Sequence, residues 1–116
     1  MAAEETQQSA RILLIDSHPI TLLGLNALLE ACSDYEVVDK LSLTSGITEI
    51  LKQKRPDLVL MDLHLPKTNG INLIREINAA TENSAKIVIL TSALSQAETC
   101  DLIRTAVKGM LLKEMA

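Results

Sequence analysis

The sequence contains almost no aromatic side chains: one tyrosine, no phenylalanine and no tryptophan among 116 residues. A hydrophobic core must therefore be built from Leu, Ile, Val, Ala and Met, and a hydrophobic content of 47% supplies enough of them. No apolar run approaches the length of a membrane span. The net charge is −4 and no basic run appears, so nothing indicates that this segment binds nucleic acid.

Cysteine, glycine and histidine are also scarce. The two cysteines show no metal-ligand spacing, which favours unpaired thiols in a reducing compartment. The four glycines match neither G-x-G-x-x-G nor a P-loop, which argues against a nucleotide-binding fold. His18 and His64 are too isolated in the sequence to indicate zinc. Residues 1–9 are polar and partly acidic, so we expect a flexible tail on a cytoplasmic protein rather than a signal peptide.

What the chain does have is a regular alternation of apolar runs and helical stripes. Strands are expected at residues 12–15, 35–38, 58–61, 86–90 and 109–112, the second of them short and weak. Helices are expected at residues 19–31, 47–51 and 71–77, and from the S-x-x-E capping box at Ser95 through about Val107. This alternation of strands and helices predicts a single α/β domain over residues 10–116, with a doubly wound, five-stranded parallel sheet.

Polar residues fall where the expected strands end. Asp16 and Ser17 follow the first strand, and Asp62, Thr91 and Lys113 follow the third, fourth and fifth. Each has an ordinary explanation by itself: a helix cap, a strand end or a solvated charge. In a doubly wound sheet, however, all would meet at one edge, where ligands bind. Together they supply a carboxylate nucleophile, a hydroxyl and a cation, which are the groups that phosphoryl transfer needs.

The order of these segments resembles the receiver domain of two-component response regulators. The matching segments are residues 11–19 (RILLIDSHP), 62–66 (DLHLP) with Gly70, 90–92 (LTS) and 109–113 (GMLLK). The His18-Pro19 pair and the G-x-L-L-K ending are most similar to the NarL/FixJ group, whose receivers usually precede a helix-turn-helix DNA-binding domain. The resemblance implies the flavodoxin-like receiver fold.

The resemblance also implies roles for individual residues. Asp62 matches the phospho-acceptor, which takes a phosphoryl group from a sensor histidine kinase. The family pattern implies a Mg²⁺ ion held by Asp16, Asp62 and the backbone carbonyl of His64. Thr91 and Lys113 would hold the phosphoryl group, and movement of Thr91 would switch an output surface. Such a domain is not an enzyme beyond self-phosphotransfer and autodephosphorylation.

Two residues depart from the family pattern. Ser17 replaces the acid that usually contacts Mg²⁺ directly, and a neutral hydroxyl removes a negative charge from the ion's ligands. We expect weaker Mg²⁺ binding, with a water at that position, although Asp16 and Asp62 could suffice. Met110 occupies the place of a switching Tyr or Phe, and it can be either a flexible substitute or a plain core methionine.

The chain stops where the family has a fifth helix, which would cover one face of the sheet. Its absence would leave part of the core at the first and third strands open to water, so we expect a piece of a longer regulator or cover from another chain, including a possible homodimer. DNA would be bound only through an output domain outside this chain, and no membrane is involved.

The main alternative is a pseudo-receiver, an interaction module that works without phosphorylation. A haloacid-dehalogenase-type phosphatase is disfavoured, because it needs an acid where His64 stands.

Overall fold

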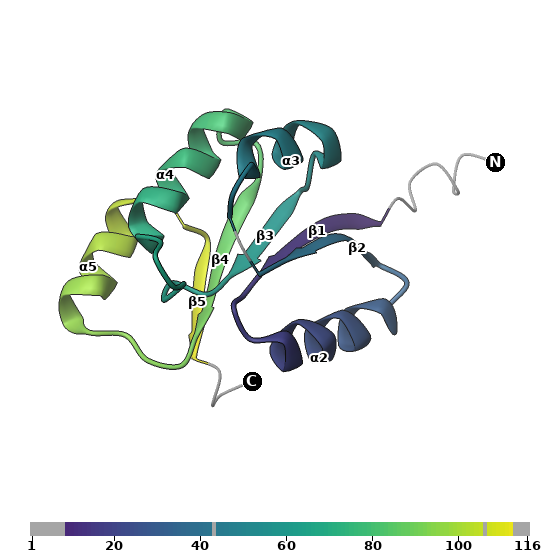
Figure 1. Ribbon diagram of the computed structural model, residues 1–116, viewed down its shortest axis with the longest axis horizontal. Coiled ribbons are helices and arrows are strands. Elements are labelled where there is room, and N and C mark those ends of the chain that lie inside the picture. Colours follow the sequence, from purple (N-terminus) through teal and green to yellow (C-terminus); the bar gives the residue numbers. More distant parts are fainter. Residues whose placement is uncertain (1–8, 43, 106, 113–116) are drawn as a thin grey trace.

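The computed structural model describes residues 9–42, 44–105 and 107–112, and within them five strands alternate with four helices (Figure 1). The strands are β1 (Ala10–Ile15), β2 (Tyr35–Leu41), β3 (Leu58–Met61), β4 (Lys86–Thr91) and β5 (Gly109–Leu112). The helices are α2 (Pro19–Glu30), α3 (Ile47–Lys54), α4 (Gly70–Thr81) and α5 (Gln96–Arg104). None of these helices combines the length and the apolar character of a bilayer-spanning segment.

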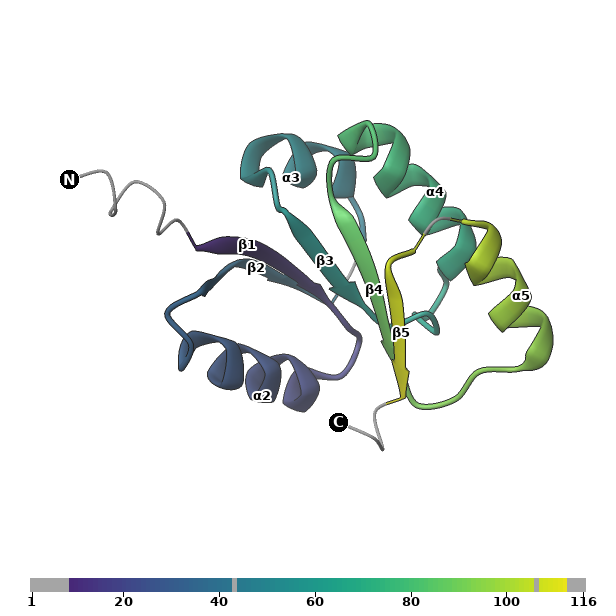
Figure 2. The ribbon, with the colours of Figure 1, turned by 180° about the vertical axis from the view of Figure 1, so that it is seen from behind.

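All the strand pairs are parallel, and the sheet order is β2-β1-β3-β4-β5. Helix α2 lies on one face of this sheet, and α3, α4 and α5 lie on the other (Figures 1 and 2). The predicted α/β class with a doubly wound, five-stranded parallel sheet is confirmed. This order places the C-terminal ends of β1, β3 and β4 next to one another.

The core is divided by the sheet into two clusters, because successive strand residues point to opposite faces. On β1, Leu13 and Ile15 join the larger cluster with α3, α4 and α5, whereas Ile12 and Leu14 pack against α2. All four of these side chains are at most 1% exposed. Burial on both faces explains why β1 reads as a continuous apolar run rather than as an alternating one.

Two elements differ from their predicted bounds. The second strand, expected to be short, runs to Leu41, and its register with β1 shifts between Ile12 and Leu13. Its last part includes Asp39 and Lys40, and polar residues are usual on an edge strand. Helix α5 ends at Arg104, three residues before the expected end at Val107, and the Thr105 hydroxyl donates to the Leu102 carbonyl at 2.8 Å. A threonine that binds its own helix backbone competes with the next helical turn.

The uncovered apolar surface lies further along the sheet than expected. We predicted exposure at the first and third strands, but α2 covers β1. On the same face, Leu58 and Leu60 of β3 are half-buried, and Leu111 of β5 is 49% exposed. The prediction was therefore wrong for β1, because α2, the one helix on that face within the described residues, packs over the β1 side of the sheet.

At the N-terminus, the Ser9 hydroxyl donates to the Ser33 carbonyl at 3.0 Å and strand β1 begins at Ala10. The remainder of the expected tail, residues 1–8, lies outside the described residues.

Candidate functional site

Three buried polar side chains meet at the C-terminal edge of the sheet. Asp16 follows β1, Asp62 follows β3, and Thr91 is the last residue of β4. Their exposed fractions are 3%, 2% and 0%. The Asp62 backbone N–H donates to the Ile15 carbonyl at 3.0 Å, which fixes the two loops to each other. The sheet order therefore brings together three of the residues that the sequence singled out.

The two aspartates are held by the same local turn. The Oδ1 atom of Asp16 accepts from the His18 backbone N–H at 2.8 Å. The Oδ1 atom of Asp62 accepts from the His64 backbone N–H at 3.0 Å. In each case an aspartate bonds the backbone two residues further on, which helps to orient its carboxylate.

Thr91 is in direct contact with the expected phospho-acceptor. Its hydroxyl donates to Asp62 Oδ1 at 2.7 Å, and this bond is buried. A buried hydroxyl that donates to a carboxylate is a strong, oriented contact. Any group added to the Asp62 carboxylate must therefore change the surroundings of Thr91.

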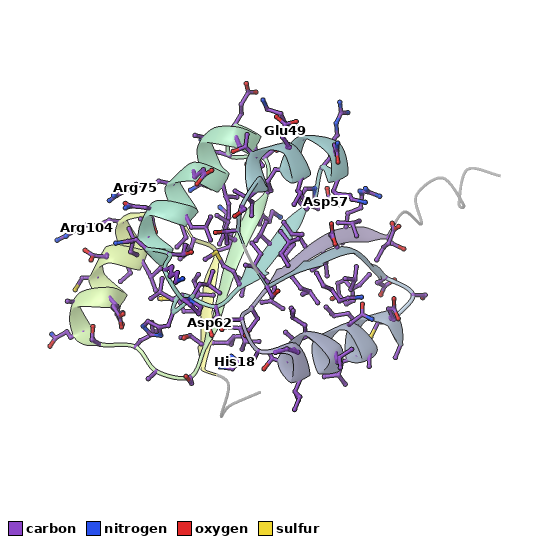
Figure 3. The ribbon with its side chains drawn as sticks, viewed as in Figure 1. His18, Glu49, Asp57, Asp62, Arg75 and Arg104 are labelled. Carbon is purple, nitrogen blue, oxygen red and sulfur yellow. The ribbon has the colours of Figure 1, made fainter. Side chains whose placement is uncertain are left out.

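A divalent cation fits the donor atoms of this edge. One ligand atom from each of Asp16, His18 and Asp62 lies within 4.8 Å of the others. Two of these residues, His18 and Asp62, are labelled at this edge of the sheet in Figure 3. Two carboxylates buried so close together repel each other, and a cation between them relieves that repulsion. Carboxylate oxygens are the ligands that Mg²⁺ and Ca²⁺ prefer, whereas an imidazole also suits softer divalent ions.

Sequence reasoning missed both histidine side chains. The His18 Nδ1 atom lies 2.9 Å from Asp16 Oδ1. His64, expected to act through its backbone carbonyl only, places Nδ1 3.2 Å from the Thr91 hydroxyl and Nε2 2.6 Å from Glu98 Oε2. A repeated Asp-x-His at the ends of β1 and β3 was the available signal. In the first copy the imidazole contacts the aspartate, and in the second it contacts Thr91 and Glu98.

Of the remaining predicted residues, the structure describes Ser17 and Met110. Ser17 is half-buried in the loop between β1 and α2. Met110 is partly buried against the larger core cluster, as a core methionine would be. Lys113 lies outside the described residues. The roles expected of Ser17, Met110, Lys113 and the His64 carbonyl remain predictions.

Glu98, in the first turn of α5 near the site, has a lowered pKa. The Ser95 backbone N–H donates to its carboxylate, and the hydrogen bond to His64 lowers the pKa further from the ordinary value of 4.5. A carboxyl group whose pKa falls on folding stabilises the protein above its unfolded pKa, and this stabilisation is lost as the pH drops through the folded pKa.

We therefore expect Glu98 to contribute to the loss of stability below pH 4.5, and Glu98→Gln to remove that part of the loss. Urea unfolding followed by circular dichroism at a series of pH values measures it. Glutamine keeps the capping geometry, so the comparison isolates the charge. An unchanged acid dependence in the variant would contradict this assignment.

Comparison with known proteins gives a matching family and related sequences. The model of the response regulator receiver domain family matches residues 12–116. The transcriptional regulatory protein MctR of Rhizobium johnstonii is 35% identical over 106 residues, which are 91% of this chain and 49% of MctR. The nitrate/nitrite response regulator protein NarL of Escherichia coli is 30% identical over 109 residues, 94% of this chain and 50% of NarL.

A solved structure shares the fold over almost the whole chain. The isolated REC domain of RcsB from Salmonella enterica serovar Typhimurium, in the presence of the phosphomimetic BeF3⁻, matches with a TM-score of 0.85 and 25% identity. The match covers 94% of this chain and 80% of that one. This chain spans about half the length of the curated relatives above. From the family model, these relatives and the shared fold, we conclude that the chain belongs to the family of response regulator receiver domains.

Proposed function

We propose that Asp62 is the phospho-acceptor of this receiver domain and takes its phosphoryl group from a sensor histidine kinase. A carboxylate oxygen of Asp62 attacks the phosphorus atom and forms an acyl phosphate, while the bond from phosphorus to the kinase histidine nitrogen breaks. The observation that carries the proposal is the buried contact between Asp62 and Thr91, at 2.7 Å, beside Asp16. A nucleophile, a hydroxyl and a metal-type carboxylate thus share one site.

Receiver domains bind Mg²⁺ at an acidic cluster, and the corresponding group here comprises Asp16, His18 and Asp62. When bound, the ion offsets the negative charge that otherwise keeps a carboxylate and a phosphoryl donor apart. Asp16 and Asp62 would hold it, with the His64 carbonyl as a further ligand. Ser17 offers a hydroxyl in place of a carboxylate, so we propose that the affinity for Mg²⁺ is reduced.

Thr91 is proposed to report phosphorylation. Its hydroxyl already bonds Asp62, so a new phosphoryl oxygen offers it a closer acceptor of higher charge. Lys113 would hold another phosphoryl oxygen. The surface changed in this way is proposed to control transcription through an output domain outside this chain, since MctR is a transcriptional regulatory protein and NarL a response regulator. A homodimer belongs to the same proposal.

The test is phosphate incorporation from acetyl phosphate in the presence of Mg²⁺, followed by intact-protein mass spectrometry. We expect one added phosphoryl group in the parent chain and none in Asp62→Asn, which keeps the size of the side chain and removes the nucleophile. Labelling that persists in Asp62→Asn would place the acceptor elsewhere.

The alternative function is a pseudo-receiver that binds a partner without phosphorylation. Ser17 favours it, because the neutral side chain stands where the family pattern has an acid. If the parent takes up no phosphoryl group at any Mg²⁺ concentration while Ser17→Asp does, the site has the required geometry and lacks only that charge. That result would favour the pseudo-receiver.

A further inference from the structure

The side chain of His64 bridges Thr91 and helix α5. Its Nδ1 atom lies 3.2 Å from the Thr91 hydroxyl, which donates to Asp62 at 2.7 Å. Its Nε2 atom lies 2.6 Å from Glu98 Oε2. A continuous row of hydrogen-bonded groups therefore runs from the buried carboxylate of Asp62 to the first turn of α5.

The direction of these bonds is set by the single proton of the threonine hydroxyl. Since Thr91 donates that proton to Asp62, its oxygen is left to accept from His64 Nδ1–H. The Nε2 atom then donates to the Glu98 carboxylate. This assignment puts a proton on both ring nitrogens of His64, the imidazolium form; in the neutral ring Nδ1 would instead share the hydroxyl proton of Thr91 with Asp62. In either form, rotation of the Thr91 side chain removes the contact with His64.

Glu98 divides its two oxygens between this row and the start of α5. Oε1 accepts from the Ser95 backbone N–H at 2.8 Å, and Oε2 faces His64. In return, the Ser95 hydroxyl accepts from the Glu98 backbone N–H at 3.1 Å, which completes a capping box. A displacement of His64 therefore acts on the same carboxylate that closes the first turn of α5.

We propose that His64 is a positioning residue that couples the Thr91 hydroxyl, through Glu98, to the first turn of α5. Its regulatory consequence rests on the proposed function: a phosphoryl group on Asp62 draws the Thr91 hydroxyl away from His64, and the cap of α5 responds. The contribution is to coupling rather than to stability. His64 and Glu98 side chains are 46% and 34% exposed, and such pairs stabilise a fold only slightly.

The first experiment measures this coupling without phosphorylation, by hydrogen exchange at the Glu98 and Thr99 amides, which bond Ser95. We expect Thr91→Val to speed exchange there about threefold in the parent background, in keeping with the weak energy of an exposed pair. In a His64→Ala background the same substitution should have no effect, because the connection is already lost.

Ser95→Ala is the matched control, since it breaks the capping box and leaves the His64 contact in place. Exchange should be faster overall in this variant, and Thr91→Val should still add its threefold effect. Equal effects of Thr91→Val with and without His64 would overturn the proposal. So would the loss of the effect in Ser95→Ala together with its survival in His64→Ala.

The second experiment adds beryllofluoride as the phosphoryl mimic, with ¹⁹F NMR to measure the bound fraction. Per bound molecule, the change in exchange at Glu98 and Thr99 should be several-fold in the parent and close to zero in His64→Ala. An undiminished response in His64→Ala would overturn the coupling. A parent that binds no beryllofluoride would count against the proposed function instead, and the first experiment would still decide on His64.

Discussion

Gly70→Ala is expected to destabilise the fold by about 3 kcal/mol, at the upper end of the cost of overpacking a core. A Cβ atom on Gly70 would lie 2.3 Å from the Leu63 carbonyl oxygen and 2.6 Å from Leu63 Cδ1. The first of these is a backbone atom, so a side-chain rotation cannot remove the clash. Either the start of α4 or the loop after β3 must move.

The same substitution should also impair the site. Leu63 stands between Asp62 and His64, and the turn that orients the Asp62 carboxylate passes through it. Shifting the Leu63 carbonyl therefore disturbs both the Asp62 side chain and the His64 backbone. We expect phosphorylation by acetyl phosphate to be slower by about tenfold or more at a temperature where the variant is folded, because small errors in position are costly for group transfer.

Urea unfolding followed by circular dichroism measures the loss of stability, since the chain has no tryptophan to serve as a fluorescent reporter. Gly24→Ala is the matched control: it lies within α2, and nothing is found within 4 Å of its Cβ position. That variant should be more stable by up to about 1 kcal/mol, as alanine is the better helix former. A Gly70→Ala variant as stable as Gly24→Ala would show that the close approach is absent.

The contrast between these two glycines shows which features of the fold could be predicted from the sequence and which could not. From the sequence, Gly70 was identified only as one of the residues that match the receiver family. The reason for a glycine there is a contact with Leu63, seven residues earlier, and no local pattern encodes that distance. The closeness of Asp62 and Thr91 was easier to predict, because a parallel sheet brings the ends of neighbouring strands together whatever the details of packing.

Features set by side-chain orientation or by edge pairing were predicted less well. His64 was assigned a backbone role only, because the position of its ring depends on Glu98, which lies 34 residues away. The continuation of β2 through Asp39 and Lys40 was missed, because an edge strand exposed to water shows little regular alternation of apolar and polar residues. The apolar stripes, by contrast, identified all the described strands and helices, since each buries a face against the core.

Ser17→Asp is expected to lower the Mg²⁺ concentration needed for half-saturation by about tenfold, which corresponds to about 1.4 kcal/mol. The half-buried Ser17 lies next to Asp16, so a carboxylate there adds negative charge beside the Asp16, His18 and Asp62 group. That charge attracts the ion and repels the two buried aspartates. Two effects of opposite sign should follow from the one substitution.

Without Mg²⁺, the third carboxylate should reduce the free energy of unfolding by about 1 kcal/mol, because like charges are brought together in a partly buried site. Saturating Mg²⁺ should reverse this loss, since a ligand that binds the folded state stabilises it. Isothermal titration calorimetry gives the affinity directly, and urea unfolding with and without Mg²⁺ gives the stabilities. Ser17→Asn is the control, because it lengthens the side chain without a charge and should leave the affinity within about twofold of the parent. If Ser17→Asp and Ser17→Asn bind Mg²⁺ equally, a charge at this position does not affect the affinity, and the proposal that Ser17 reduces it is wrong.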